Sequence, residues 1–371
     1  MRSTLLSAAL IVRNEERFLE GCLRSLEGRV DEVVVVDTGS TDRSCEIARD
    51  FGARLLNHAW ADDFSTARNA SVAAASGKWI LYIDADERVV EFDRPTVDAL
   101  LADTWHVCYT TLFRPAAGYT RYREYRLFRN RPDLRFRGII HESLAPALED
   151  LCARTRLKIG DSPVALDHLG YDGDLQHKHT RNLPLLRARL EGDPQHVYCR
   201  DQLGLTLKGL GDDAGAEAAW RQAIDIVRKA PVKGPEDSLP YLHLAGLLLD
   251  QKHDATALLE EACRLFPDHH SLTWLRARRL VEAGSYAAAM PLFARLAAID
   301  ANDIAAGPIA FDVSIFGAQA HAALGLCAYR LGRFAESAAH YARAEALAPD
   351  DLEIRAKRAV AAARVRSRPA A

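Results

Sequence analysis

The 371-residue sequence predicts an α/β domain with a mostly parallel, Rossmann-like sheet, followed by an all-α domain of helical repeats. Three observations support this fold class. Short apolar runs alternate with helix-period segments in the first part of the chain, as in parallel sheets. After about residue 190, Ala- and Leu-rich helical segments recur with a similar internal pattern. The chain also exceeds the length of one typical domain, so we expect domains at 1–190 and 191–371.

The first part of the chain alternates strand and helix patterns. A strand is expected at 7–12, and a helix at 15–27 has apolar residues three and four positions apart. The Val-rich run at 32–36 is typical of a parallel strand buried on both faces. A helix at 42–51 and a third strand at 53–56 follow. This βαβ spacing indicates a doubly wound sheet.

Two acidic residues follow an apolar run that reads as a buried strand. The run is 79–83, and Asp84-Ala85-Asp86 comes directly after it. Two carboxylates at that spacing can share one divalent cation, which also binds substrate phosphates. The alternative is a solvated turn with helix-capping acids. Asp37 also ends a strand, before a turn at Gly39, so we expect Asp37 and the acid pair to face one crevice at the carboxyl ends of the strands.

Four motifs occur in order with suitable spacing. Together they resemble family 2 glycosyltransferases of the GT-A fold, over about residues 5–185. The closer likeness is to bacterial lipopolysaccharide-core glucosyltransferases and peptide S-glycosyltransferases. The motifs are Ile11-Val12-Arg13-Asn14-Glu15-Glu16, Val36-Asp37-Thr38-Gly39-Ser40-Thr41-Asp42, Ala67-Arg68-Asn69-Ala70 and Ile83-Asp84-Ala85-Asp86-Glu87.

The resemblance implies a nucleotide-sugar donor, with a UDP-sugar the first choice, and Mn²⁺ or Mg²⁺ as cofactor. Asp37 would accept from the base edge, and Asp84 would bind the ribose or a water on the metal. Asp86 would coordinate the metal directly, and Arg68 would lie near the nucleotide. A salt bridge to the sheet is the alternative role for Arg68. The residues implied in donor binding are Val12, Asn14, Glu15, Asp37, Arg68, Asp84, Ala85 and Asp86.

A second part of the site is expected downstream. A short apolar strand at 136–140 leads to His141 and Glu142. By the family pattern Glu142 is the general base, His141 orients it or contacts the diphosphate, and His168 is a third metal ligand beside Asp84 and Asp86. The alternatives are a helix-terminal acid for Glu142 and a structural histidine for His168. The weaker base candidates are Glu15, Asp37 and Asp167.

An arginine- and aromatic-rich segment at 113–137 is expected to form strands. Residues 114–137 contain eight Arg against Glu124 and Asp133, a local balance of 8 − 2 = +6. Stacked aromatic and Arg side chains can bind single-stranded nucleic acid. The whole chain has net charge −3, which argues against that partner class. A basic face for a diphosphate or an anionic acceptor, or a solvated strand face, fits better.

The helical segments after residue 190 resemble tetratricopeptide repeats. About four helix pairs are expected, with inserts at 231–239 and 301–315, and the helix 351–366 would cap the stack. The repeats could dock a peptide or protein acceptor, pair with a second copy, or serve as a scaffold. These three alternatives stay open.

The sequence therefore predicts a metal-dependent, inverting glycosyltransferase. Its acceptor would be an envelope glycan, a lipopolysaccharide core, a peptide or a protein. The alternative is a non-catalytic adaptor whose repeats bind a protein. Seven scattered Cys and no apolar run of about 18 residues indicate a cytoplasmic protein without a transmembrane segment. Peripheral contact with the inner membrane through the basic end of the last helix is a second choice.

Overall fold

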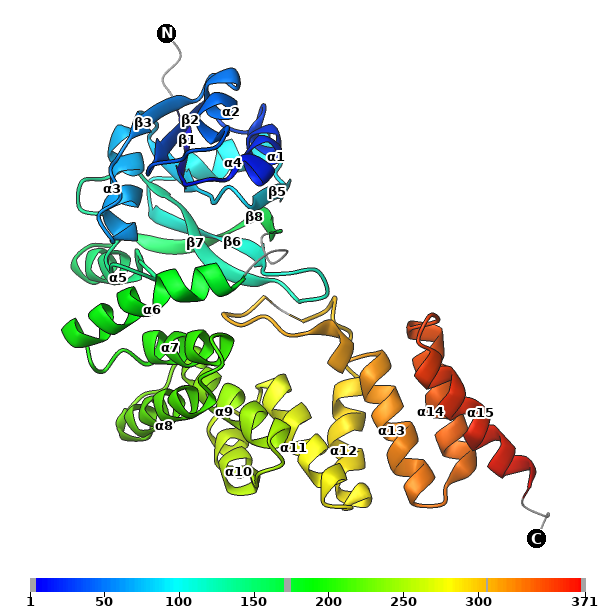
Figure 1. Cartoon of the computed structure of the whole chain (residues 1–371). Coiled ribbons are helices and arrows are strands. Elements are labelled where there is room, and N and C mark those ends of the chain that lie inside the picture. Colours follow the sequence, from blue (N-terminus) through cyan, green and yellow to red (C-terminus); the bar gives the residue numbers. More distant parts are fainter. Residues whose placement is uncertain (1–4, 170–174, 305, 368–371) are drawn as a thin grey trace. The chain divides into compact units, whose positions relative to one another are not determined.

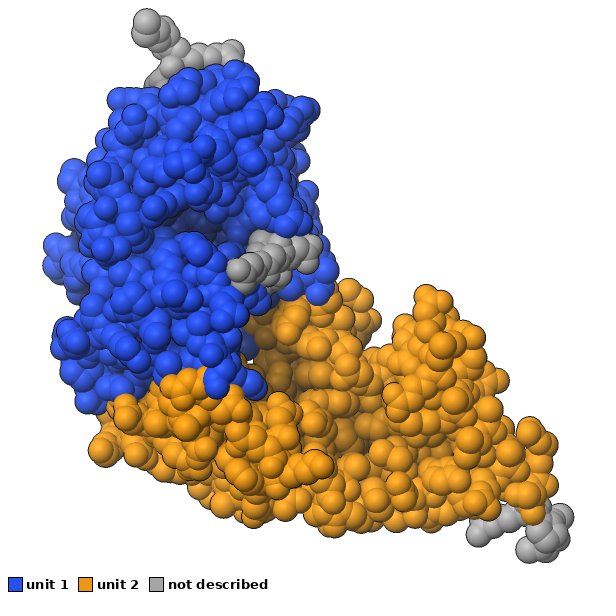
Figure 2. All heavy atoms as spheres, viewed as in Figure 1, with its two compact units in different colours: residues 1–117, 121–211, 306–309 blue, residues 118–120, 212–305, 310–371 orange. Residues whose placement is uncertain are grey.

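The computed structural model describes residues 5–169, 175–304 and 306–367. These residues form two compact units, shown in Figure 2. Of the described residues, unit 1 contains those within 1–117, 121–211 and 306–309, and unit 2 contains those within 118–120, 212–305 and 310–371. The boundary near residue 190 stays a prediction, because compact units do not define sequence domains.

Unit 1 is built on an eight-stranded sheet with the order β3-β2-β1-β4-β7-β6-β8-β5. Strands β3, β2, β1 and β4 run parallel, β7 is antiparallel to β4, and β6 and β8 form a further parallel pair. The strand bounds are β1 Leu6–Val12, β2 Glu32–Asp37, β3 Arg54–Asn57, β4 Trp79–Tyr82, β5 Glu87–Glu91, β6 His106–Arg114, β7 Tyr122–Arg129 and β8 Lys158–His168. The predicted mostly parallel α/β sheet is confirmed.

Helices cover both faces of this sheet. On one face α1 (Glu16–Leu26), α2 (Ser44–Asp50) and α4 (Arg94–Leu101) share a core with β1 and β4. On the other face α3 (Phe64–Ala74) and α5 (Ala145–Arg154) pack on β2, β4 and β7. Successive residues of a strand point to opposite faces, so the apolar runs of β1, β2 and β4 supply both cores.

Unit 1 also contains α6 (Leu175–Gly192) and α7 (Val197–Gly209). Leu185, Leu186 and Leu190 of α6 and Cys199 of α7 form a core with Ile140. The loop 139–142 is thereby held against these helices.

Unit 2 is helical, with antiparallel helix pairs typical of tetratricopeptide repeats (Figure 1). Its helices are α8 Asp213–Lys229, α9 Leu239–Asp250, α10 Thr256–Leu265, α11 His270–Glu282, α12 Tyr286–Ala297, α13 Ala318–Arg330, α14 Phe334–Leu347 and α15 Leu352–Arg366, with short 3₁₀ helices at Pro235–Ser238 and Val313–Ile315. The predicted all-α repeat region is confirmed. Among the described helices, none is long and apolar enough to span a bilayer.

One local prediction was wrong. Residues 136–140 form no strand but part of a loop, which a single bridge between Arg137 and Ser143 closes. The loop is instead fastened to α3, where the Asn69 amide exchanges two hydrogen bonds with the backbone of Phe136. Side-chain contacts of this kind leave no periodicity in the sequence.

Candidate active site

The predicted donor-binding residues gather at the carboxyl edge of β1, β2 and β4. Val12 ends β1 and pairs with Asp37 at the end of β2, while Asp84 lies two residues after β4. Because these three strands are adjacent and parallel, their ends lie at one edge of the sheet.

The loops after β1 and β2 are tied to each other. Asn14, which has a positive φ of 58°, donates its N–H to Ser40 Oγ and accepts from Thr41 N–H through Oδ1. Asp37 accepts from the N–H groups of Gly39 and Ser40, so both of its oxygens hold its own turn. A ligand at Asp37 would therefore meet a carboxylate whose orientation is already set.

Glu15 faces the acid pair from the start of α1. Burial raises the pKa of Glu15 to about 7; the charge of Asp86 adds to the rise, Lys178 opposes it and Asp84 contributes less. A carboxyl group of this kind gains or loses its proton near neutral pH. Lys178 and its neighbour Arg181 on α6 bring positive charge to this region, and burial lowers the pKa of Arg181.

Arg68 of α3 links the two halves of the predicted site. Its Nη2 donates to Asp84 Oδ1 at 3.0 Å, and its Nε donates to Glu142 Oε1 at 2.7 Å. The guanidinium lies over the rings of Tyr82 and Phe136, with 8 % of the side chain exposed. Arg68 thus joins two predicted site acids through salt bridges, Asp84 in the turn after β4 and Glu142 in the loop before α5.

Glu142 and His141 differ in their surroundings. Glu142 is 9 % exposed, and its Oε1 accepts from Arg68 Nε. The same guanidinium also binds Asp84, so Arg68 connects the two carboxylates. His141 has a positive φ of 50° and packs edge-to-face on Tyr198 of α7. Burial, with a smaller effect of His196, lowers the pKa of His141 to about 4, so the ring is neutral at pH 7.

Asp86 and His168 meet across β5 and β8. His168 Nε2 lies 3.1 Å from Asp86 Oδ2, and His168 Nδ1 lies 3.1 Å from the carbonyl oxygen of Pro115. Burial alone would lower the pKa of His168, but the hydrogen bond and charge of Asp86 and the charge of Glu87 raise it. Each of the two side chains is 17 % exposed.

The third predicted metal ligand, Asp84, is engaged elsewhere. Burial alone would raise its pKa, but the charges of Arg68 and Arg126 hold the pKa of Asp84 below its usual range. In the described parts of the chain, no three His, Cys, Asp or Glu side chains converge on one metal position. Asp86 and His168 nevertheless offer the oxygen and imidazole donors that suit Mn²⁺. Such a cation commonly takes its other ligands from phosphates and water.

Arg126 and Glu87, which the sequence did not place in the site, support the acidic turn. Arg126 of β7 binds Glu87 through both terminal nitrogens, at 3.1 and 2.9 Å. Burial raises the pKa of Glu87, and the charge of Arg126 opposes that rise. The signal was present in the alternation of Tyr122, Glu124 and Arg126 along one strand face.

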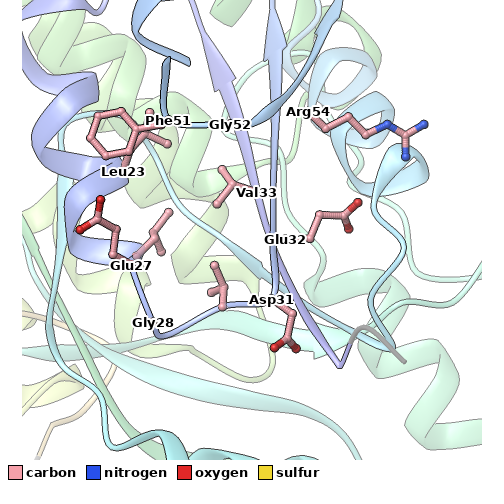
Figure 3. A pocket seen from close by; sticks show the side chains of 11 residues that line it. Leu23, Glu27, Gly28, Asp31, Glu32, Val33, Phe51, Gly52 and Arg54 are labelled. Atoms are coloured by element: carbon pink, nitrogen blue, oxygen red, sulfur yellow. The ribbon is translucent and has the colours of Figure 1, made fainter. Parts of the chain in front are cut away.

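A pocket of about 340 Å³ lies away from this edge, near the amino end of β2 (Figure 3). Asp31, Glu32 and Val33 line it together with Phe51 and Arg54. Asp31 accepts from Leu5 and Leu6, so this pocket surrounds the opposite end of the strands from Asp37.

Comparison with known proteins identifies the two parts of the chain. Residues 7–148 match the family described as glycosyl transferase family 2, and residues 318–351 match the tetratricopeptide repeat. The chain carries a family 2 glycosyltransferase domain. The acidic turn, Asp37, Arg68 and Glu142 all fall within the matched range, whereas His168 lies after the end of this family 2 match.

Three relatives illustrate these similarities. A TPR repeat-containing protein of Synechococcus elongatus is 39 % identical over 233 residues, which cover 61 % of this chain and 58 % of that protein. The lipopolysaccharide core biosynthesis glycosyltransferase LpsC of Rhizobium meliloti is 31 % identical, over 44 % of this chain and 65 % of its own length. The SPbeta prophage-derived glycosyltransferase SunS of Bacillus subtilis is 25 % identical, over 61 % of this chain and 53 % of its own length. The chain thus spans little more than half the length of the first relative.

Proposed function

We propose that unit 1 transfers a sugar from a nucleotide diphosphate donor to an acceptor, with inversion at the anomeric carbon. The observation that carries this proposal is the meeting of Asp86 and His168, 3.1 Å apart, beside Asp84 at the carboxyl end of the sheet. The family 2 match over residues 7–148 supports the reaction class. The first donor to test is a UDP-sugar.

In this proposal Asp86 and His168 hold the divalent cation, Mn²⁺ or Mg²⁺. When bound, the cation would neutralise negative charge on the leaving diphosphate. Asp84, which Arg68 keeps ionised and oriented, accepts from a hydroxyl of the ribose or from a water. Asp37 accepts from the base edge of the nucleotide, with Val12, Asn14, Glu15 and Ala85 shaping the surrounding wall.

The proton balance requires a base on the acceptor side. Glu142 is our first candidate, and its fixed contact with Arg68 ties its position to that of Asp84. It would take the proton of the acceptor group as that group attacks from the side opposite the nucleotide. His141 would orient Glu142 from the same loop. Neutral His141 has no positive charge to offer a diphosphate, so we favour the orienting role.

The acceptor is proposed by class: an envelope glycan, a lipopolysaccharide core, a peptide or a protein. The similarity to LpsC, a lipopolysaccharide core biosynthesis glycosyltransferase, supports the saccharide choice. The tetratricopeptide match at 318–351 favours a protein partner for unit 2, either the acceptor or a second copy. A purely non-catalytic adaptor is the second candidate function, and that match is the observation favouring it.

The test uses the full chain with Mn²⁺ and UDP-, GDP- or dTDP-sugars, first for thermal stabilisation and then for donor hydrolysis. We expect Mn²⁺-dependent release of nucleoside diphosphate with one donor class. Asp86→Ala should lower this rate by about 10²-fold or more, because several kcal/mol of charge stabilisation at the diphosphate is lost.

Asp133→Ala is the matched control. Asp133 pairs with Arg131 on the surface, and exposed pairs contribute little. It should therefore leave turnover unchanged. If no donor is bound or hydrolysed, the transferase proposal fails and the adaptor function is favoured.

A further inference from the structure

The turn that carries Asp84 and Asp86 is closed by the side chain of Glu87. The Asp84 N–H donates to Glu87 Oε2 at 2.9 Å, and the Glu87 N–H donates to the Asp84 carbonyl oxygen at 3.0 Å. One carboxylate therefore holds the first residue of the turn from inside. Loss of this side chain would free the Asp84 N–H at the start of the turn that also carries Asp86.

Arg126 fixes both the position and the orientation of that carboxylate. Its Nη1 donates to Glu87 Oε2 at 3.1 Å and its Nη2 donates to Glu87 Oε1 at 2.9 Å. Two parallel hydrogen bonds of this kind define a plane as well as a distance. The Arg126 and Glu87 side chains are only 6 % and 2 % exposed.

The guanidinium is itself held on its remaining sides. Its Nε donates to Glu124 Oε2, and Glu124 also accepts from the Tyr122 hydroxyl. The Arg126 guanidinium lies 4.3 Å from the centre of the Tyr82 ring. Its Nη1 is 3.9 Å from Asp84 Oδ2, so it also contributes positive charge beside the turn.

A buried ion pair is a poor source of stability, because apolar residues of similar volume often stabilise a core as well or better. The Arg126–Glu87 pair directly contacts the acidic turn, which indicates a role in holding the geometry of that turn. On the basis of the proposed function, we propose that Arg126 and Glu87 are positioning residues. They hold Asp84 and Asp86 in the arrangement that binds the donor diphosphate with its cation.

The experiment compares binding rather than turnover. Titration calorimetry of the full chain measures UDP affinity with Mn²⁺ present, with GDP and dTDP as parallel probes. The double variant Glu87→Met/Arg126→Met removes both partners of the buried pair, while Glu124, which is 23 % exposed, keeps its hydrogen bond from Tyr122, so we expect the variant to fold. Its affinity for the nucleotide that the parent binds should fall by at least about ten-fold, as for other groups that orient metal ligands.

Arg126→Lys is the conservative variant. It keeps a positive charge beside Glu87 but cannot donate two parallel hydrogen bonds. Its nucleotide affinity should therefore lie between those of the parent and the double variant. Arg129→Met on the same strand is the control. The Arg129 guanidinium donates to the carbonyl oxygens of His106 and Asp103, far along the strand from the turn. This substitution should change stability but not nucleotide affinity.

The outcomes separate the two proposals. A parent that binds nucleotide together with a folded double variant that binds equally tightly would overturn the positioning role alone. If the double variant does not fold, a folded Arg126→Lys protein with parental affinity would overturn it. A folded parent that binds none of the three diphosphates would instead refute the proposed function, and the positioning role with it.

Discussion

Glu142 and Glu15 are the two carboxylates between which the choice of general base lies. Glu142 is nearly buried, and its Oε1 accepts a hydrogen bond from Arg68 Nε at 2.7 Å. Glu15 has a pKa of about 7, which suits a base at neutral pH. The position of Glu142 in the family pattern favours Glu142 as the base, whereas the raised pKa of Glu15 favours Glu15.

Glu142→Gln tests the first choice. The amide oxygen can still accept from Arg68, so folding should persist, while the transfer rate should fall by about 10²–10⁴-fold because base catalysis is lost. The measurement is kcat with an identified donor and acceptor. Glu149→Gln on the exposed face of α5 is the control. Near-parental kcat in Glu142→Gln, with loss in Glu15→Gln, would move the role to Glu15.

The pH dependence of stability gives a second prediction at Glu15. Its pKa is about 7 when folded and about 4.3 when unfolded, so its favourable contribution is complete below pH 4.3 and is lost as pH rises through 7. Glu15→Gln should therefore gain free energy of unfolding relative to the parent between pH 4.5 and 7.5. Allowing for solvent screening, the gain should be about 1 kcal/mol. Urea denaturation with a chelator present measures it, and a pH-independent difference would contradict it.

Residue types at strand ends predicted much of the candidate site, because parallel strands bring their carboxyl ends together. The order Asp37, Asp84, Asp86 could be placed at one edge on that ground alone. The contacts that connect them could not. Arg68 reaches Glu142 across 74 residues. His168 was expected beside Asp86 only through the family resemblance, and in the structure the two meet because β8 pairs with β5 in antiparallel register. Such register depends on tertiary packing and leaves no local pattern in the sequence.

Among the elements, the strands and helices with clear periodicity were predicted to within a few residues. The helix expected at 15–27 is α1 at Glu16–Leu26, and the one expected at 42–51 is α2 at Ser44–Asp50. The loop around residue 138 was mistaken for a strand because its apolar residues pack against α6 rather than pair with a neighbouring strand. Short apolar runs do not distinguish these two outcomes.

Helix pairs of unit 2 pack through small residues, and Gly325 of α13 shows how closely. A Cβ added there would lie 2.9 Å from the Tyr341 ring, which is almost fully buried. Gly325→Ala should therefore destabilise the protein by about 1–2 kcal/mol through overpacking. At Gly246 in α9 an added Cβ would meet no other described atom within 4 Å, apart from its chain neighbours and the backbone of its own helix. Gly246→Ala should instead stabilise by about 0.5–1 kcal/mol through helix propensity.

Thermal or urea unfolding of both variants provides the measurement. Opposite signs for the two glycines are the expected result. Equal effects would mean that α13 and α14 are not packed as closely as Tyr341 and Gly325 indicate.

For the whole molecule, the two units have separate cores, and each candidate donor contact lies in unit 1. The net charge of −3 is small, so charge as a whole does not select a partner; the local groups around Asp84 and Arg68 do. We therefore expect donor binding to stabilise unit 1 alone.

Hydrogen exchange measures this directly. With UDP at a hundredfold excess over its Kd and Mn²⁺ present, amides that exchange only by unfolding of unit 1 should gain up to about 2.7 kcal/mol of protection. The largest changes should fall at the turn 84–87 and the loop 37–42, because the proposed contacts lie there. Amides of α13, α14 and α15 should exchange as before, since no proposed donor contact involves unit 2. Equal protection of those helices would contradict this expectation. It would indicate that the two units unfold as one cooperative body, so that donor binding also stabilises the repeats.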